Sequence, residues 1–150
     1  MKIRCGFVTN SSSSSFILGF KNEDEISEVM DLLPEYWSEE VRGDIISDIE
    51  YGITTKDEAI KKYQKHIYTW DWEFNGKTSW DMTKEERLSD EYQKFIQNKK
   101  DKLSEDFIDE LNQYDIISIV NYEDHTRLGS ELEHDIMPCL KCTIERLSHH

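Results

Sequence analysis

The last third of the chain gathers carboxylate and imidazole side chains, the groups most able to bind a metal ion or to move a proton. Four of the five histidines lie within residues 125–150, interspersed with acidic residues. A water molecule on a metal held by such groups becomes a nucleophile near neutral pH. Without a metal, a histidine beside a carboxylate can act as a general acid or base. The sequence therefore predicts a chemical site here, with a divalent metal, Zn²⁺ or Mn²⁺, as the expected cofactor.

This cluster supplies two overlapping sets of candidate residues. The candidate catalytic residues are Asp124, His125, Glu133 and His134. The candidate metal ligands are Glu133, His134, Asp135 and His149. Their spacing does not match an established metal motif such as His-Glu-x-x-His. A solvated polar loop followed by a tail therefore stays open as the alternative interpretation.

A tract of five serines near the start of the chain is the second candidate site. The candidate binding residues of this tract are Asn10, Ser11, Ser12, Ser13, Ser14 and Ser15. Their amides and hydroxyls could form a nest for an anion or offer hydroxyls for modification. The alternative is a solvated connector or a polar edge strand. Our hypothesis is that residues 10–15 bridge two neighbouring strands and lie near the C-terminal cluster.

Three tryptophans, Trp70, Trp72 and Trp80, form the third candidate binding group, because tryptophan is favoured at interfaces. Apolar and polar residues alternate from 68 to 74, which is typical of a strand, and an Asn-Gly pair follows. We expect a β-hairpin over residues 68–82. A two-residue turn would pair Trp70 with Asp81, whereas a three-residue loop pairs Trp70 with Trp80 and collects the aromatic rings on one face. The three-residue loop is preferred, and the rings could equally form part of the core.

The remaining patterns predict the elements that must position these groups. Strands are expected at residues 3–8, 16–20, 115–122 and 139–147, and helices at 22–33, 38–51, 55–67, 83–96 and 103–111. The last two helices could be one long helix or could restart at Ser104. We therefore expect a single α+β domain over residues 1–150. Its small, mostly antiparallel sheet would be built from both chain termini, with the strand at 115–122 pairing to segments from both ends. About four or five helices would cover one face, and the aromatic hairpin would be inserted among them.

The charge balance limits the classes of partner. The chain has 32 acidic and 18 basic residues, a net charge of −14. Such a surface repels phosphates, so we expect neither direct nucleic-acid binding nor binding to an anionic membrane. A protein with a basic surface is the expected partner, and the alternative is that the acidity only keeps the protein soluble. No run reaches the ~18 apolar residues of a membrane span, and an odd number of cysteines is typical of reduced thiols, so a cytoplasmic location is expected.

The opening residues resemble those of a known group of proteins. The run Gly6-Phe7-Val8-Thr9-Asn10, followed by the serines and Phe16, is similar to the start of many small, uncharacterised phage and Firmicutes-type proteins. Residues 122–124 and 132–136 also resemble later signatures of some members. The resemblance implies a phage-type origin and a bacterial host cell, and it assigns no activity.

Two functions follow from these observations. The first is a small acidic phage-type accessory protein that binds a host protein, in its sharpest form an anti-defence inhibitor that mimics nucleic acid. The alternative is a metal-dependent hydrolase or phosphodiesterase that uses the C-terminal Asp/Glu/His cluster.

Overall fold

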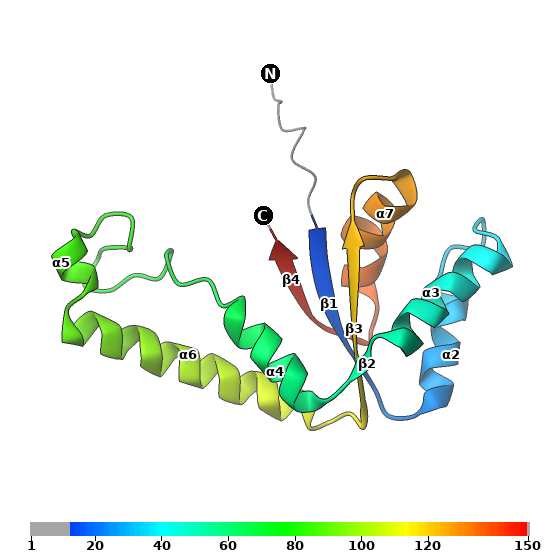
Figure 1. Ribbon diagram of the computed structural model, residues 1–150, viewed down its shortest axis with the longest axis horizontal. Coiled ribbons are helices and arrows are strands. Elements are labelled where there is room, and N and C mark those ends of the chain that lie inside the picture. Colours follow the sequence, from blue (N-terminus) through cyan, green and yellow to red (C-terminus); the bar gives the residue numbers. More distant parts are fainter. Residues whose placement is uncertain (1–12, 150) are drawn as a thin grey trace, which may run out of the picture.

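The computed structural model describes residues 13–149, and for residues 148–149 it describes the backbone alone (Figure 1). The strand expected at residues 3–8 therefore lies outside the described residues, as do the candidate residues Asn10, Ser11 and Ser12. The fold is α+β, with one four-stranded antiparallel sheet and helices that make up most of the remaining structure, as the sequence predicts.

The sheet joins strands from the two ends of the described chain. Its order is β2-β3-β1-β4, with β1 at Ser13–Phe20, β2 at Ile53–Thr54, β3 at Ile116–Glu123 and β4 at Thr143–His149. The prediction that the strand near residues 115–122 pairs with both ends was wrong. Instead β1 is the strand with a long neighbour on each side, β3 on one and β4 on the other. The serines extend β1 beyond the expected start at Phe16, because both of its edges are paired and the backbone hydrogen bonds compensate for a poor strand-forming sequence.

Helices connect the strands. Their bounds are α2 Glu23–Leu32, α3 Glu39–Tyr51, α4 Lys56–Lys65, α5 Lys84–Arg87, α6 Asp90–Leu111 and α7 Arg127–Glu131, followed by a π-helical turn η1 Leu132–Ile136 and a 3₁₀ turn η2 Met137–Cys139. The helices expected from residues 22, 55 and 83 begin there: the side chains of Asn22, Thr55 and Thr83 each accept a hydrogen bond from the backbone N–H three residues on and so cap the helix. Residues 90–111 form one long helix with its own cap at Ser89.

Two apolar clusters hold helices against opposite faces of the sheet. Phe16, Leu18 and Phe20 of β1 pack with α2 and α3, whereas Ile17 faces α4 and α6. Alternate residues of a strand point to opposite faces, so the apolar run 16–20 of β1 must be covered on both sides. The expectation that the helices cover a single face was therefore wrong. Both layers are visible in Figure 1, with α2 and α3 to one side of the sheet and α4 and α6 to the other.

The aromatic segment reverses direction within residues 68–82, but it forms one β-bridge, Phe74 with Lys77, in place of two paired strands. The preferred three-residue loop was wrong. Asn75 (φ 52°) and Gly76 (φ 78°) form a two-residue turn, which matches the preference of Asn-Gly for left-handed backbone at both positions. Because the pairing stops after one bridge, the register does not propagate, and the Trp70 and Trp80 rings still meet with centroids 4.8 Å apart.

The segment between β3 and β4 differs most from expectation. Residues 127–139 are helical where a loop was expected, and β4 begins at Thr143, four residues after the predicted start. In the part of the chain that the structure describes, every helix is too short or too polar to cross a lipid bilayer.

Candidate functional site

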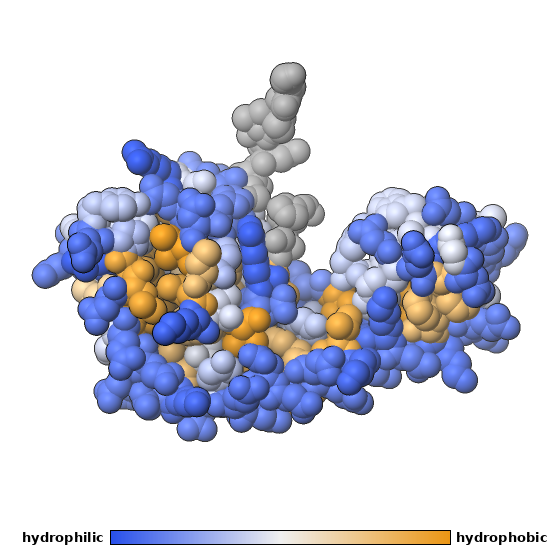
Figure 2. Space-filling model, turned by 180° about the vertical axis from the view of Figure 1, so that it is seen from behind, coloured by the Kyte–Doolittle hydropathy of each residue, from blue (hydrophilic) through white to orange (hydrophobic). Residues whose placement is uncertain are grey.

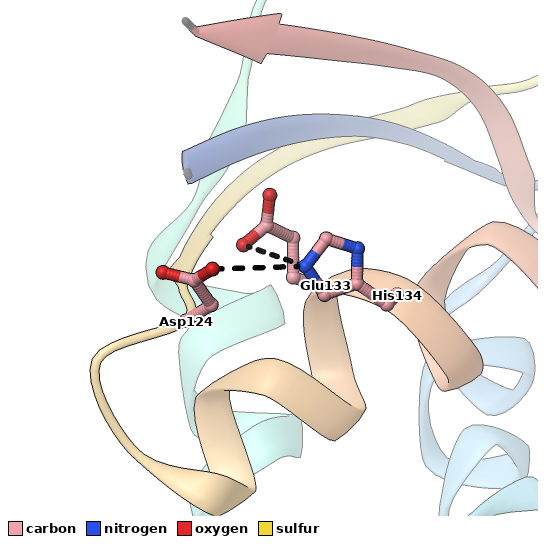
Figure 3. Close-up of side chains that lie close together, drawn as sticks. All are labelled: Asp124, Glu133 and His134. Atoms are coloured by element: carbon pink, nitrogen blue, oxygen red, sulfur yellow. Dashed lines mark ion pairs between the residues drawn. The ribbon is translucent and has the colours of Figure 1, made fainter. Parts of the chain in front are cut away.

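A cluster of ionisable side chains lies at the end of the sheet where β1 begins. It draws Asp124 from the loop after β3, Glu133 and His134 from η1, Ser14 from β1 and Arg146 from β4. Figure 3 shows the carboxyl groups of Asp124 and Glu133 directed toward the imidazole of His134. Segments more than 100 residues apart in the sequence therefore meet in one place.

Glu133 is the buried centre of the cluster. Its side chain has no exposed surface, and Ser14 Oγ donates a hydrogen bond to Oε1 across 2.9 Å. Arg146 Nη2 lies 3.5 Å from the same oxygen. A carboxylate is retained in a protein interior only when charge and hydrogen bonds compensate for its lost hydration, and these two side chains provide both.

Arg146 links the members of the cluster. Its Nε donates to Ser14 Oγ across 3.1 Å, and its Nη2 lies 3.5 Å from His134 Nδ1. The guanidinium also stands 5.8 Å from the centre of the Phe16 ring. The planar guanidinium thus contacts an acid, a hydroxyl and an imidazole at once, which fixes its position in the cluster.

His134 faces both carboxylates through its other ring nitrogen. Nε2 lies 3.7 Å from Glu133 Oε2 and 3.9 Å from Asp124 Oδ2 (Figure 3). Successive residues of a regular α-helix point about 100° apart and do not face a common point. In η1 the backbone is wound as a π-helix, and both Glu133 and His134 reach the same centre.

Two other candidate residues of this region lie apart from the cluster. His125 is exposed and pairs with Glu123 at 2.7 Å. Asp135 is exposed and lines a groove with Leu32 and Leu140. The backbone of His149 pairs with Ser13 at the end of β4. The structure thus brings together Asp124, Glu133 and His134 among the predicted residues.

The described serines of the N-terminal tract all lie in β1. Ser14 and Ser15 are buried, and Ser13 is half-buried. Ser14 contacts Glu133, and Ser15 Oγ is hydrogen-bonded to Asn121 Oδ1 on β3. For this part of the tract, the hypothesis of a segment between two strands and near the C-terminal cluster agrees with the geometry.

The three candidate tryptophans belong to an arm that projects from the sheet and consists of residues 66–89 with the adjoining half of α6 (Figure 1). The Trp70 and Trp80 rings contact each other at an angle of 48°, and Trp80 is 64% exposed. Trp72 instead lies under Lys99, whose Nζ is 4.6 Å from its ring. Phe74 packs against Tyr92 and Phe95 of α6, so the arm has its own small aromatic cluster.

A third feature is the acidic surface of the α2–α3 hairpin. Residues 21–51 contain eleven acidic and two basic residues, so this segment carries −9 of the net charge of −14. The acidic residues are Glu23, Asp24, Glu25, Glu28, Asp31, Glu35, Glu39, Glu40, Asp44, Asp48 and Glu50. All except Glu25 are exposed. The charge is therefore concentrated on one pair of helices.

A groove lies beside this acidic surface. Glu25, Glu28 and Asp31 of α2 line it together with the apolar side chains of Val29 and Leu32, and Lys141 and Cys142 lie in the opposite wall. Figure 2 shows an apolar patch bordered by hydrophilic side chains on the half of the molecule that carries α2 and α3. The surface thus combines a charged border with an apolar floor.

The turn between α2 and α3 is tied to α7. Tyr36, 75% exposed, donates its hydroxyl to Glu131 Oε2 across 2.9 Å. This hydrogen bond lowers the pKa of the Glu131 carboxyl and raises the pKa of the Tyr36 phenol. The contact holds the acidic hairpin in a defined position relative to the segment that carries Glu133.

Arg146 is the member of the cluster that the sequence analysis missed. The signal in the sequence was the single arginine of the last strand, which follows Glu145 and precedes Leu147. A partly buried charge such as Arg146 needs a partner, but the sequence does not show which one.

The fold and the cluster define an α+β protein with a buried carboxylate at one end of its central strand. Comparisons of the chain with protein-family models, with curated proteins and with solved structures each give no match. The function must therefore be inferred from the geometry of the chain itself.

Proposed function

We propose that this chain is a small phage-type accessory protein that binds a basic surface of a host protein in the cytoplasm of a bacterial cell. The observation that carries the proposal is the concentration of charge on the α2–α3 hairpin, −9 within 31 residues. A surface of this kind attracts a basic partner over several ångströms and raises its rate of association.

The carboxylates are arranged in rows on the two helices. Asp24, Glu28 and Asp31 follow one another at helical spacing on α2, and Glu40, Asp44 and Asp48 do so on α3. Residues four apart on a helix are separated by about 6 Å along its axis. Rows of negative charge resemble the phosphate rows that a basic groove is built to bind, which supports the sharper form of the proposal, an anti-defence inhibitor that mimics nucleic acid.

Apolar anchors complete the surface. Leu32, which lines the groove, and Tyr36, in the turn after α2, are both more than half exposed. Charged rims give specificity and association rate, whereas buried aromatic and aliphatic anchors give most of the affinity. The hairpin offers both to one partner, and the Trp70–Trp80 pair on the arm offers a second, separate contact.

The test is capture of a host protein by variants with equal net charge. In Glu28→Gln/Asp31→Asn/Glu35→Gln, three charges are removed from the exposed surface of α2 and the turn. In the matched control, Asp101→Asn/Glu105→Gln/Asp109→Asn, three are removed from α6. Immobilised protein is incubated with bacterial cytosol, and the bound protein is eluted with salt or with duplex DNA.

We expect one basic protein to be retained by the wild type and by the α6 control but lost from the α2 variant. The basic protein should be released from the immobilised chain between about 0.05 and 0.5 M salt, because exposed charges become screened over this range. Release by DNA would support the mimicry. Equal retention by the two triple variants would exclude the α2–α3 hairpin as the binding surface.

A further inference from the structure

We propose that Asp124, Glu133 and His134 form a binding site for one divalent transition-metal ion, Zn²⁺ or Mn²⁺. The ligand atoms are Asp124 Oδ2, Glu133 Oε2 and His134 Nε2. The site uses no residue of the acidic hairpin. It keeps Glu133 and His134 from the ligands expected from the sequence, adds Asp124 and leaves out the exposed Asp135.

The distances between the ligand atoms are close to those of a formed site. His134 Nε2 is 3.7 Å from Glu133 Oε2 and 3.9 Å from Asp124 Oδ2, and the three ligand atoms all lie within 4.8 Å of one another. Ligands about 2.1 Å from a tetrahedral metal are separated by roughly 3.4 Å. Small rotations of the Asp124 and His134 side chains would close the difference. Both are partly exposed, at 27% and 42%, so they have room to turn.

The buried ligand is already oriented. Ser14 Oγ and Arg146 Nη2 contact Oε1 of Glu133, and Oε2 is the oxygen that faces the imidazole. Groups that hold a ligand by its second atom are typical of metal sites, because they fix its direction. Two carboxylates and one imidazole around a single centre also match the donors that Zn²⁺ and Mn²⁺ take.

The protein supplies three ligands, so part of the coordination sphere would face solvent beside Asp124 and His134. A site of this type keeps a position for water or for a ligand oxygen, as in catalytic metal sites. Arg146 lies at the edge of the same cluster and could pair with an anionic ligand bound there. The site therefore fits a small anionic ligand, which is also the substrate class of the hydrolase considered from the sequence.

The test is direct titration of the untagged, full-length chain with ZnCl₂ and, separately, with MnCl₂ by isothermal calorimetry. We expect one equivalent of metal to bind. Asp124→Asn and His134→Ala should each weaken binding at least tenfold, on the order of the loss produced by removing groups in or next to a metal shell. Both side chains are partly exposed, so these variants should fold, which circular dichroism would check.

The matched control is His125→Ala, which removes an exposed imidazole one residue from Asp124 and leaves the cluster intact. A second control, His149→Ala/His150→Ala, removes the last two histidines of the sequence. Both should bind metal as the wild type does. The proposal is overturned if neither metal binds the wild type, if His134→Ala binds as tightly as His125→Ala, or if binding is lost with the last two histidines.

Discussion

At the scale of single residues, Glu133 depends on a few neighbours because it is fully buried. Ser14→Ala would remove the hydroxyl that donates to Oε1 and leave part of a buried carboxylate without that bond. We expect the free energy of unfolding to fall by about 1–3 kcal/mol. Urea denaturation would measure it, with Ser27→Ala on the exposed surface of α2 as the control. An equal effect of the two substitutions would show that the Ser14–Glu133 bond adds no stability.

Glu145 on β4 offers a prediction on pH. Burial raises the pKa of its carboxyl, so the folded chain holds this proton more tightly than the unfolded chain does. Its contribution to stability is therefore complete below the ordinary carboxyl pKa and is lost as the pH rises through the raised value. Glu145→Gln should raise the melting temperature at pH 7 and change it little at pH 4. Thermal melts between pH 4 and pH 7 would measure this, with Glu105→Gln at an exposed position as the control. If Glu145→Gln raised the melting temperature equally at pH 4 and pH 7, the raised pKa of Glu145 would not be the cause.

Arg146 contacts two of the proposed metal ligands, Glu133 and His134, so its substitution tests the site. A metal on His134 Nε2 places the ring proton on Nδ1, which now lies 3.5 Å from the guanidinium. Arg146→Gln removes a positive charge and supplies a carbonyl that can accept a hydrogen bond from this N–H, while Ser14 still donates to Glu133 Oε1 and keeps the carboxylate oriented. We expect metal affinity to rise several-fold while the metal-free variant melts at a lower temperature, because Glu133 has lost its cation. Calorimetry and thermal melts with and without Zn²⁺ would measure both effects, and weaker metal binding would contradict the proposed geometry.

At the scale of elements, the local signals in the sequence were the informative ones. Asn22, Thr55 and Thr83 each predicted a helix start, because a cap depends on residues three positions apart. The strand at Ile116–Glu123 was also predicted to within one residue. By contrast, η1 has no local signature. Glu133 in this turn contacts Ser14 of β1 and Arg146 of β4, which are distant in the sequence. The sequence therefore pointed to Glu133 and His134 as candidates, but it did not show that both face one point.

Gly129 shows how an element positions the site. A Cβ at this residue would lie 2.0 Å from the carbonyl oxygen of Glu123, so α7 packs against the end of β3 only because the side chain is absent. Gly129→Ala must displace the loop that carries Asp124, and overpacking of this kind costs about 1–3 kcal/mol. Gly43→Ala on α3 is the matched control, since its Cβ would meet nothing within 4 Å and should stabilise the helix by about 0.5–1 kcal/mol. Chemical denaturation would compare them, and equal signs would contradict this packing argument.

At the scale of the whole molecule, the sequence predicted the α+β class and the pairing of strands from distant parts of the chain. It did not show that helices cover both faces. The run Phe16, Ile17 and Leu18 is apolar on both faces of the strand, and this was the local signal for cover on both sides. The serines before it obscured the fact that β1 lies inside the sheet, between β3 and β4. The position of β1 between β3 and β4 depends on long-range pairing, which periodicity within a short window does not detect.

The distribution of charge should also carry a cost in stability. Eleven carboxylates on one helical hairpin repel one another in the folded state, and the same negative potential is what would attract a basic partner. Glu28→Gln/Asp31→Asn/Glu35→Gln should therefore melt at a higher temperature than the wild type at low ionic strength. The gain should disappear near 1 M salt, where the Debye length is about 3 Å. The α6 triple variant should gain less, because Lys99, Lys100 and Lys102 already lie among its carboxylates. If the α2 variant melts no higher than the α6 control at low salt, the hairpin charges do not repel strongly, and the inference from charge to binding loses its support.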